Sequence, residues 1–243
     1  MGTDHNEYIN KKRNAWRIFD RIYKKYDLLN HILSIGFDFH WRKKLSTLIG
    51  NKKGSALLDL ATGTGDVLFS LIKHSDGFKR AVGVDMSFNM LRYAVGKAGK
   101  KKESGVSFIL GDANNIPVKT GSFDIATMAF GIRNISEPVI ALKDIHRTLS
   151  DEGLALILEF SLPENKFFKS LHLFYLRYIL PVIGKIVSGD VEAYRYLNKT
   201  IETFPYGDDF ILLMKDSGFH DCERFPLTMG IVTIYRGKKI SGK

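Results

Sequence analysis

Five residues at the ends of expected strands have the chemistry to hold a nucleoside. They are Asp59, Gly63, Gly65, Asp85 and Asp112, in the stretches LLDLATGTGD, AVGVDMS and GDANNIP. A carboxylate accepts hydrogen bonds from two donors at once, and a nucleoside offers hydroxyl and amino donors. Glycine allows positive φ and a close approach of the backbone to a ligand. The set therefore predicts a site that brackets a nucleoside between carboxylates.

The turn after the first strand does not suit a pyrophosphate. Dinucleotide-binding turns read G-x-G-x-x-G, and Leu68 stands where the third glycine would fall. Asp66 lies at the mouth of the next expected helix, where its charge would repel a phosphate. A ligand with a sulfonium, an ammonium and no phosphate, such as S-adenosylmethionine, suits this turn better.

Each carboxylate can be matched to one part of S-adenosylmethionine. We expect Asp59 to accept from the ammonium group and Asp85 from both ribose hydroxyls. Asp112 is placed to accept from the adenine amine, with the Ala113 N–H donating beside it. Helix capping is the alternative role for Asp66 and for Asp85.

The elements that position these residues alternate along the chain. Apolar runs typical of buried strands lie at 56–60, 81–85, 106–110, 122–130 and 153–160, and helical patterns fill 66–74, 87–98 and 138–149. Such alternation predicts a parallel sheet with helices on both faces. Near the C-terminus, apolar and polar residues alternate in 219–225 and in 228–236, as they do in the two strands of an antiparallel hairpin. We predict an α/β, Rossmann-like class I S-adenosylmethionine-dependent methyltransferase fold, with a mostly parallel seven-stranded sheet and a C-terminal antiparallel hairpin.

Two helical regions stand outside this alternation. Residues 1–50 read as an N-terminal helical lid, and 51–243 as the methyltransferase domain with a helical insertion of three stretches at about 164–217. Within the insertion, the segment 166–187 is rich in leucines and aromatics, and Pro181 is expected to break it.

Composition narrows the class of protein. The net charge of +10 favours an anionic partner such as nucleic acid, anionic lipid or an acidic substrate. The lone Cys222 excludes an internal disulfide, and no histidine or carboxylate spacing suggests a metal site. No signal-peptide h-region and no membrane-spanning run is evident, so we expect a cytoplasmic protein.

Four longer motifs occur in a family-specific order. They are FDRIYKKYDLLNHILSIGFDFHWRK, FGIRNI, LEFSLP and AYRYLNKTIETFP. With them the chain resembles, over about residues 16–238, the ubiquinone/menaquinone biosynthesis C-methyltransferase family, and most closely its demethylmenaquinone methyltransferases. The resemblance implies S-adenosyl-L-methionine as cofactor, with contacts from Thr64, Asp85, Asp112 and Ala113. A further family contact, usually a serine, falls on Ala129, which offers only its backbone.

The resemblance also implies the reaction, methyl transfer to a ring carbon of a polyprenylated naphthoquinol. We favour conversion of demethylmenaquinol to menaquinol. A bifunctional enzyme that also acts on the ubiquinone precursor is the alternative. An RNA methyltransferase using the basic run 97–103, or a noncatalytic nucleoside-binding protein, is a weaker reading.

Three residues are candidates for the chemistry on the quinol. We assign Arg133, in FGIRNI, to stabilising the phenolate, either directly or through a water. Asn134 would orient that water or a ring oxygen, and Tyr26 would donate a hydrogen bond from the lid, with Asn30 beside it. Alternative roles are a surface salt bridge for Arg133 and packing for Tyr26. His31 is either a general base or, as we prefer, a helix-surface residue.

The segment 166–187 has three readings. It covers the quinol site and lines a channel for the prenyl tail, or it rests on an anionic membrane surface, or it is a core helix or subunit interface. A peripheral position on the inner face of the cell membrane and a homodimer follow from the second and third readings. Apart from RNA binding in the weaker reading above, we expect no nucleic-acid partner.

Overall fold

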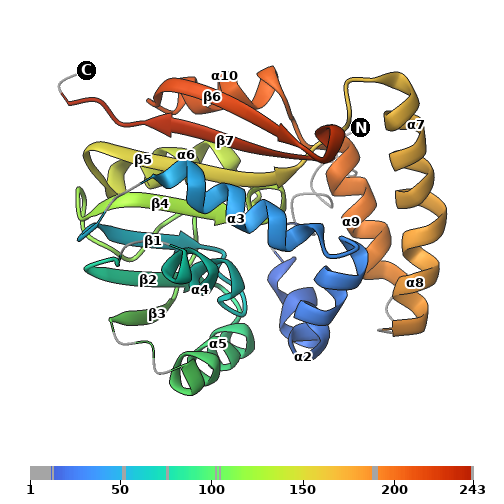
Figure 1. Ribbon diagram of the computed structural model, residues 1–243, viewed down its shortest axis with the longest axis horizontal. Coiled ribbons are helices and arrows are strands. Elements are labelled where there is room, and N and C mark those ends of the chain that lie inside the picture. Colours follow the sequence, from blue (N-terminus) through green and yellow to red (C-terminus); the bar gives the residue numbers. More distant parts are fainter. Residues whose placement is uncertain are drawn as a thin grey trace.

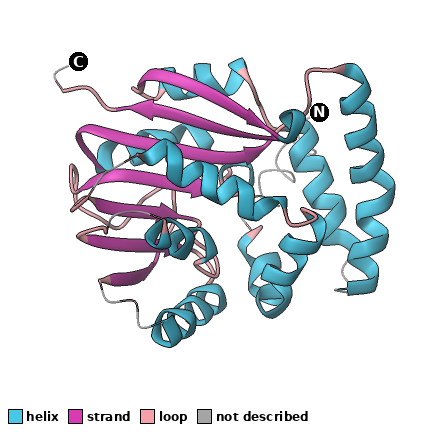
Figure 2. Ribbon diagram, viewed as in Figure 1, coloured by secondary structure: helices cyan, strands magenta, loops and turns pink. Residues whose placement is uncertain are grey.

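A seven-stranded sheet runs through the middle of the protein (Figure 1; Figure 2). The computed structural model describes residues 12, 14–50, 53–74, 77–101, 103, 105–187 and 191–241. The strands are β1 (Ala56–Leu60), β2 (Arg80–Asp85), β3 (Val106–Leu110), β4 (Phe123–Ala129), β5 (Leu149–Phe160), β6 (His220–Leu227) and β7 (Val232–Lys238). Residues 1–11 and 13 of the expected lid and Lys102 of the basic run lie outside the described residues.

The strand order is β3-β2-β1-β4-β5-β7-β6. Strands β1 to β5 are parallel, whereas β7 runs antiparallel to both β5 and β6. This confirms the fold predicted from the sequence, including the C-terminal hairpin. The chain order reverses at β1, between β2 and β4, and parallel α/β sheets bind ligands at such a switch point, beyond the carboxyl ends of the strands.

Helices cover both faces of the sheet and one end of it. They are α2 (Trp16–Leu33), α3 (Phe37–Ile49), α4 (Asp66–Lys73), α5 (Phe88–Lys101), α6 (Pro138–Thr148), α7 (Lys166–Phe174), α8 (Leu180–Val187), α9 (Val191–Thr203) and α10 (Asp208–Asp216), with short 3₁₀ turns η1 (Ile132–Asn134) and η3 (Thr228–Gly230) and a π-helical segment η2 (Tyr175–Ile179).

Two buried clusters hold helices on the faces. Leu45 of α3 and Leu68 of α4 pack on one face, with Leu57 and Ile125 of the sheet. Ile145 of α6 and Phe210 of α10 pack on the other, with Leu58 among others. Because alternate side chains of a strand point to opposite faces, the apolar run of β1 serves both clusters. Helix α10, inside the expected insertion, therefore packs on a face of the sheet.

A third cluster lies beyond the carboxyl ends of the parallel strands. Leu29 of α2, Leu176 of η2, Leu180 of α8 and Ile201 of α9 pack together there. Figure 1 shows α2, α7, α8 and α9 gathered at this end of the sheet, at the right of the view. These helices therefore close over the edge where the strand-ending carboxylates lie. None of the described helices is long and apolar enough to cross a membrane.

The expected break at Pro181 is wrong, because helical structure continues from α7 through η2 into α8. Proline removes one N–H from the helical ladder. The preceding turn is π-helical, and a widened turn is one way in which a helix absorbs such a loss. The amide of Asn198 in α9 donates to the carbonyl oxygen of Leu176, inside that turn.

Candidate active site

Two cavities meet at the carboxyl ends of the strands. The first, which we call the acidic cavity, has a volume of about 410 Å³ and is lined by Asp85, Asp112 and Ala113 among others. The second, the apolar cavity, has a volume of about 280 Å³ and extends under the helices at that end. Their shared wall is made by seven residues: Phe19, Tyr26, Ala61, Gly63, Ala129, Phe130 and Asn134. The two cavities are therefore adjacent.

Asp85 holds the glycine turn and faces the acidic cavity. Its Oδ2 accepts from the Gly63 N–H at 2.8 Å, and its Oδ1 accepts from the Ser87 N–H at 2.8 Å. Gly63 has a φ of 56°, a conformation that glycine adopts without strain. Burial raises the pKa of Asp85 above its ordinary value, although the backbone hydrogen bonds oppose that shift. The side chain that caps α5 is that of Ser87, whose Oγ accepts from the Met90 N–H at 3.2 Å, so Asp85 holds the turn and faces the cavity.

Acceptors also line the other side of the acidic cavity. Asp112 Oδ1 accepts from the Asn114 N–H at 2.9 Å, and Ala113 lies between them. The Oδ1 of Asn114 is buried without a hydrogen-bond partner. Sequence reasoning missed Asn114, although it stands in the GDANNIP motif. A wall of acceptors with one unpaired oxygen fits the amine and hydroxyl donors of an adenine nucleoside.

Asp59 is buried below the turn and lines the apolar cavity. Its two oxygens accept from the hydroxyls of Thr62 and Thr127, each at 2.6 Å. Burial raises its pKa from 3.8 to about 6, against the effect of the two hydroxyls. Each oxygen of Asp59 therefore already accepts one hydrogen bond. The ammonium group that Asp59 is expected to bind would have to share these oxygens.

The raised pKa of Asp59 predicts a pH dependence of stability. Because the folded state favours the protonated acid, its contribution is fully present below about pH 4 and is lost as pH rises through about 6. In Asp59→Asn this titration is absent. Relative to wild type, the variant should therefore gain about 2 kcal/mol of unfolding free energy between pH 4 and pH 7. Urea unfolding at both pH values measures the change, and a pH-independent difference would contradict it.

Thr64 and Gly65 do not line the acidic cavity. The Thr64 hydroxyl donates to Asp27 Oδ1 at 2.5 Å, and Thr64 lines the apolar cavity. Gly65 precedes α4 with a φ of 81°, and an added Cβ would lie 2.7 Å from the Phe69 ring. Gly65 is therefore required by the turn and by packing.

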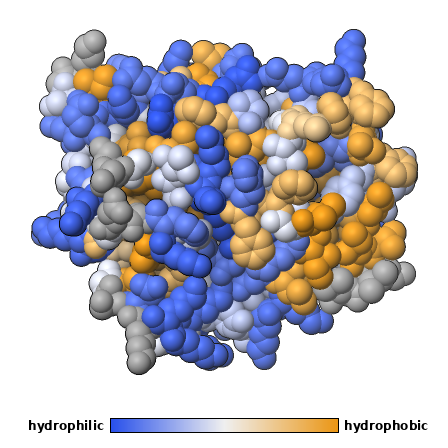
Figure 3. All heavy atoms as spheres, viewed as in Figure 1, coloured by the Kyte–Doolittle hydropathy of each residue, from blue (hydrophilic) through white to orange (hydrophobic). Residues whose placement is uncertain are grey.

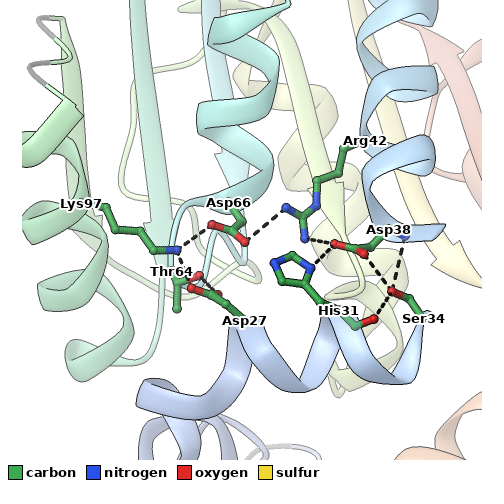
Figure 4. A network of polar contacts seen from close by, with 8 residues as sticks. All are labelled: Asp27, His31, Ser34, Asp38, Arg42, Thr64, Asp66 and Lys97. Atoms are coloured by element: carbon green, nitrogen blue, oxygen red, sulfur yellow. Dashed lines mark hydrogen bonds and ion pairs between the residues drawn. The ribbon is translucent and has the colours of Figure 1, made fainter. Parts of the chain in front are cut away.

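A network of polar contacts ties α2 to the helices around it (Figure 4). Lys97 of α5 lies 2.6 Å from both Asp27 of α2 and Asp66 of α4. Arg42 of α3 forms two ion pairs, one with Asp66 at 3.2 Å and one with Asp38 at 2.5 Å. Burial alone would raise the pKa of Asp66, but the hydrogen bond and charge of Lys97 and the charge of Arg42 lower it. Asp66 is thus neutralised by two cations, which weakens the expectation that it repels phosphate.

His31 belongs to the same network. Its Nδ1 lies 2.6 Å from Asp38 Oδ2, and its ring stacks on Phe39. It lines neither cavity. The structure therefore gives His31 a role in fixing the end of α2.

Removing the cation between the two carboxylates should loosen α2. In Lys97→Met, Asp27 and Asp66 face each other without Lys97 between them, and two partly exposed ion pairs are lost. We expect amide hydrogen exchange in α2 to become about tenfold faster. Lys100→Met, at an exposed position of the same helix, is the control. Equal exchange in both variants would show that Lys97 does not hold the lid.

Arg133 is buried against a carboxylate rather than paired at the surface. The Nη1 group donates to Glu159 Oε1 at 2.7 Å and to the Phe130 carbonyl at 2.6 Å. Arg133 and Glu159 are only 4 % and 1 % exposed. The guanidinium also lies 5.2 Å from the Phe160 ring centre, and its Nε is buried without a partner. Sequence reasoning missed Glu159, whose signal is a single charge inside the apolar run of LEFSLP.

Asn134 and Tyr26 stand in the shared wall, and Arg133 lines the apolar cavity beside them. The Asn134 amide donates to the Phe130 carbonyl at 3.3 Å, and its Oδ1 is buried without a partner. Burial raises the pKa of Tyr26, opposed by its hydrogen bond with Asn30. The Tyr26 hydroxyl is therefore protonated at neutral pH. The structure thus brings the three proposed catalytic residues together.

Comparison with known proteins gives one family and close relatives. The model of the ubiE/COQ5 methyltransferase family matches residues 7–239. A ubiquinone/menaquinone biosynthesis C-methyltransferase UbiE of Geotalea uraniireducens is 40% identical over 94% of this chain and 97% of its own. A demethylmenaquinone methyltransferase of Thermotoga maritima is also 40% identical, with the same coverage of both chains. A demethylmenaquinone methyltransferase of Porphyromonas gingivalis is 32% identical over 98% and 97%.

Solved structures share the fold at lower identity. A SAM-dependent methyltransferase of Thermotoga maritima has a TM-score of 0.65 and 20% identity, over 92% of this chain and 99% of that one. A phosphoethanolamine N-methyltransferase of Haemonchus contortus, solved with S-adenosyl-L-methionine, has a TM-score of 0.61 and 17% identity over 81% and 51%. These likenesses agree with the class of fold described above.

Proposed function

The chain belongs to the ubiE/COQ5 methyltransferase family, and from that premise we propose that it methylates a ring carbon of demethylmenaquinol to form menaquinol. The observation that carries the proposal is the shared wall of the two cavities, with Tyr26 and Asn134 in it. A cavity lined with acceptors suits the methyl donor, and an apolar cavity suits a prenylated ring. Transfer between them requires the two substrates to meet, which the shared wall allows.

S-adenosyl-L-methionine is the proposed cofactor of the acidic cavity, where it supplies an electrophilic methyl group on a sulfonium. Asp85 accepts from the ribose hydroxyls while it holds Gly63 in place. Asp112 and the unpaired Oδ1 of Asn114 accept from the adenine amine, and Ala113 donates its N–H. The burial of Asp85 strengthens these hydrogen bonds by excluding water.

Arg133, Asn134 and Tyr26 are proposed to prepare the quinol. The ring carbon becomes nucleophilic when the neighbouring hydroxyl loses its proton. After the new C–C bond forms, the same carbon loses its hydrogen as a proton to water, and the aromatic phenolate that results takes up a proton to give the methylated quinol. Arg133 cannot take that proton, because a guanidinium has a pKa above about 12. Its unpaired Nε–H instead stabilises the developing phenolate, and Asn134 Oδ1 accepts from the hydroxyl or from a water that carries the proton away. Tyr26 donates its hydroxyl hydrogen from the lid.

A substrate panel tests the proposal against its alternatives. The purified protein is given S-adenosylmethionine with reduced demethylmenaquinone, the reduced ubiquinone precursor or bulk RNA. We expect methylation of the naphthoquinol, whereas equal methylation of both quinols would make the enzyme bifunctional, as the name of the Geotalea relative suggests. Methylation of RNA alone would overturn the proposed substrate. None of the described residues in 97–103 lines either cavity.

The continuous helical segment α7–η2–α8 presents an exposed apolar face that suits a membrane surface. One side of the segment 166–187 lines the apolar cavity through Tyr175, Leu176 and Leu180. The opposite side carries five side chains that are more than half exposed: Phe167, Leu171, Phe174, Tyr178 and Val182. We call these five the apolar stripe. Figure 3 shows apolar surface at the right of the view, where Figure 1 places α7 and α8.

We propose that the apolar stripe rests on the anionic inner face of the cell membrane, where a prenylated substrate dissolves. Sedimentation with anionic vesicles tests this. Phe174→Ser combined with Tyr178→Ser should lower vesicle binding at least tenfold. Leu212→Ser removes an equally exposed leucine on α10 and should leave binding unchanged. Unchanged binding in the double variant would contradict the role of the stripe.

A further inference from the structure

His172 of α7 is a buried polar residue without a function in the reaction described above. Its side chain lines the apolar cavity and is only 7 % exposed. Its Nε2 is buried and has no hydrogen-bond partner. Buried polar atoms are nearly always hydrogen-bonded, so an unpaired one in a cavity wall points to a ligand atom.

The surroundings of His172 decide its charge. Burial among apolar neighbours lowers its pKa to about 4, and no charged group offsets that effect. The imidazole is therefore neutral at physiological pH, with one ring N–H donor and one acceptor nitrogen. A base this weak is poorly matched to a quinol hydroxyl, whose pKa is near 10 like that of tyrosine. A hydrogen bond to an uncharged oxygen is the role that fits.

The position of His172 is fixed by its helix. The π-helical segment η2 begins three residues later, and such segments occur frequently at functional sites. Asn198 of α9 donates to the Leu176 carbonyl in that segment, and the Tyr175 hydroxyl donates to the Leu33 carbonyl of α2 at 3.0 Å. These two bonds tie α7 and η2 to α9 and α2, on either side of the cavity.

We propose that His172 Nε2 hydrogen-bonds the second ring hydroxyl of the quinol, the one beside the prenyl-bearing carbon. This inference rests on the function proposed above. In a 1,4-quinol, the hydroxyl next to the carbon that is methylated is the one that Arg133 and Asn134 contact in the proposed reaction. The other hydroxyl lies next to the prenyl chain. Segments η2 and α8, which give the cavity apolar walls through Leu176 and Leu180, receive that chain. His172 lies on α7, in the same continuous helical segment.

The test compares two substrates in matched variants. One is the reduced quinol, and the other is a prenylated naphthol that lacks the hydroxyl beside the prenyl chain. The ratio of kcat/KM for the quinol to kcat/KM for the naphthol should be about ten times larger in wild type than in His172→Leu. A tenfold change is the effect of one neutral hydrogen bond. The ratio of ratios removes the difference in intrinsic reactivity between the substrates. His172→Gln should restore part of the preference, and Ser170→Ala, at an exposed position of α7, should keep all of it.

Stability without substrate gives an independent readout. A structural histidine would destabilise the fold when replaced, whereas His172→Leu removes an unpaired buried atom and should melt no lower than wild type. A lower melting temperature together with an unchanged substrate preference would overturn the inference. An unchanged preference in a stable His172→Leu would overturn it as well, while leaving the proposed function intact. A wild type that methylates no quinol would overturn the proposed function and this inference with it.

Discussion

Arg133→Ala should lose both stability and turnover. The Glu159 carboxylate, 1 % exposed, would lose its cation while it stays buried. Breaking a buried ion pair in this way costs about 3–5 kcal/mol of unfolding free energy. Turnover should fall by about 10²–10³, the usual effect of removing one group that stabilises a developing oxyanion. Denaturant unfolding and single-turnover methyl transfer measure the two effects.

A neutral double variant separates the two losses. In Arg133→Met with Glu159→Gln no charge is left buried, and the new amide oxygen can still accept from the backbone N–H of Phe160. We expect most of the stability to return, because a neutral replacement removes the desolvated charge. Turnover should stay as low as in Arg133→Ala. A stable double variant with wild-type turnover would show that the guanidinium has no part in the reaction.

Asp85→Ala should mainly lose affinity for the cofactor. The substitution removes the acceptor of the Gly63 N–H and the proposed acceptor of two ribose hydroxyls. Hydrogen bonds to a charged group are worth about 1.5–3 kcal/mol each. The dissociation constant for S-adenosylmethionine should therefore rise by at least about 10². Calorimetric titration measures it, and the KM for the quinol should change little.

A second carboxylate supplies the control. Asp124, at the opposite ends of the strands, accepts from the Ala56 N–H at 2.9 Å and lines neither cavity. Asp124→Asn should bind the cofactor as wild type does. Equal affinity of the Asp85 and Asp124 variants would rule out the ribose contact.

The strands of the fold could be predicted from local patterns, and most of their bounds differ from the structure by only one or two residues. Strand β5 is longer than expected and begins at Leu149. Its first part contains Glu152 with a φ of 59° and a shifted register with β4. A polar bend of this kind has no strand-like alternation, so the apolar run from Gly153 was the only visible signal.

Most individual residues of the candidate site could be predicted from the sequence, but the contacts between them could not. The strand-ending carboxylates are visible because each follows an apolar run. Glu159 lies 26 residues from Arg133, and Lys97 lies 31 residues from Asp66, so only the folded chain brings them together. His172 stands in an apolar helical run where nothing local separates a core histidine from one that faces a cavity. Burial and partners are tertiary properties, and these are what the sequence could not supply.

The most direct test of C-methylation is the position of the transferred methyl group. The protein is incubated with methyl-labelled S-adenosylmethionine and reduced demethylmenaquinone, and the product is analysed by carbon NMR. We expect label in a methyl group bonded to the ring carbon beside the prenyl-bearing carbon. Label in a methoxy group, or no label in the quinol, would contradict C-methylation across the shared wall of the two cavities.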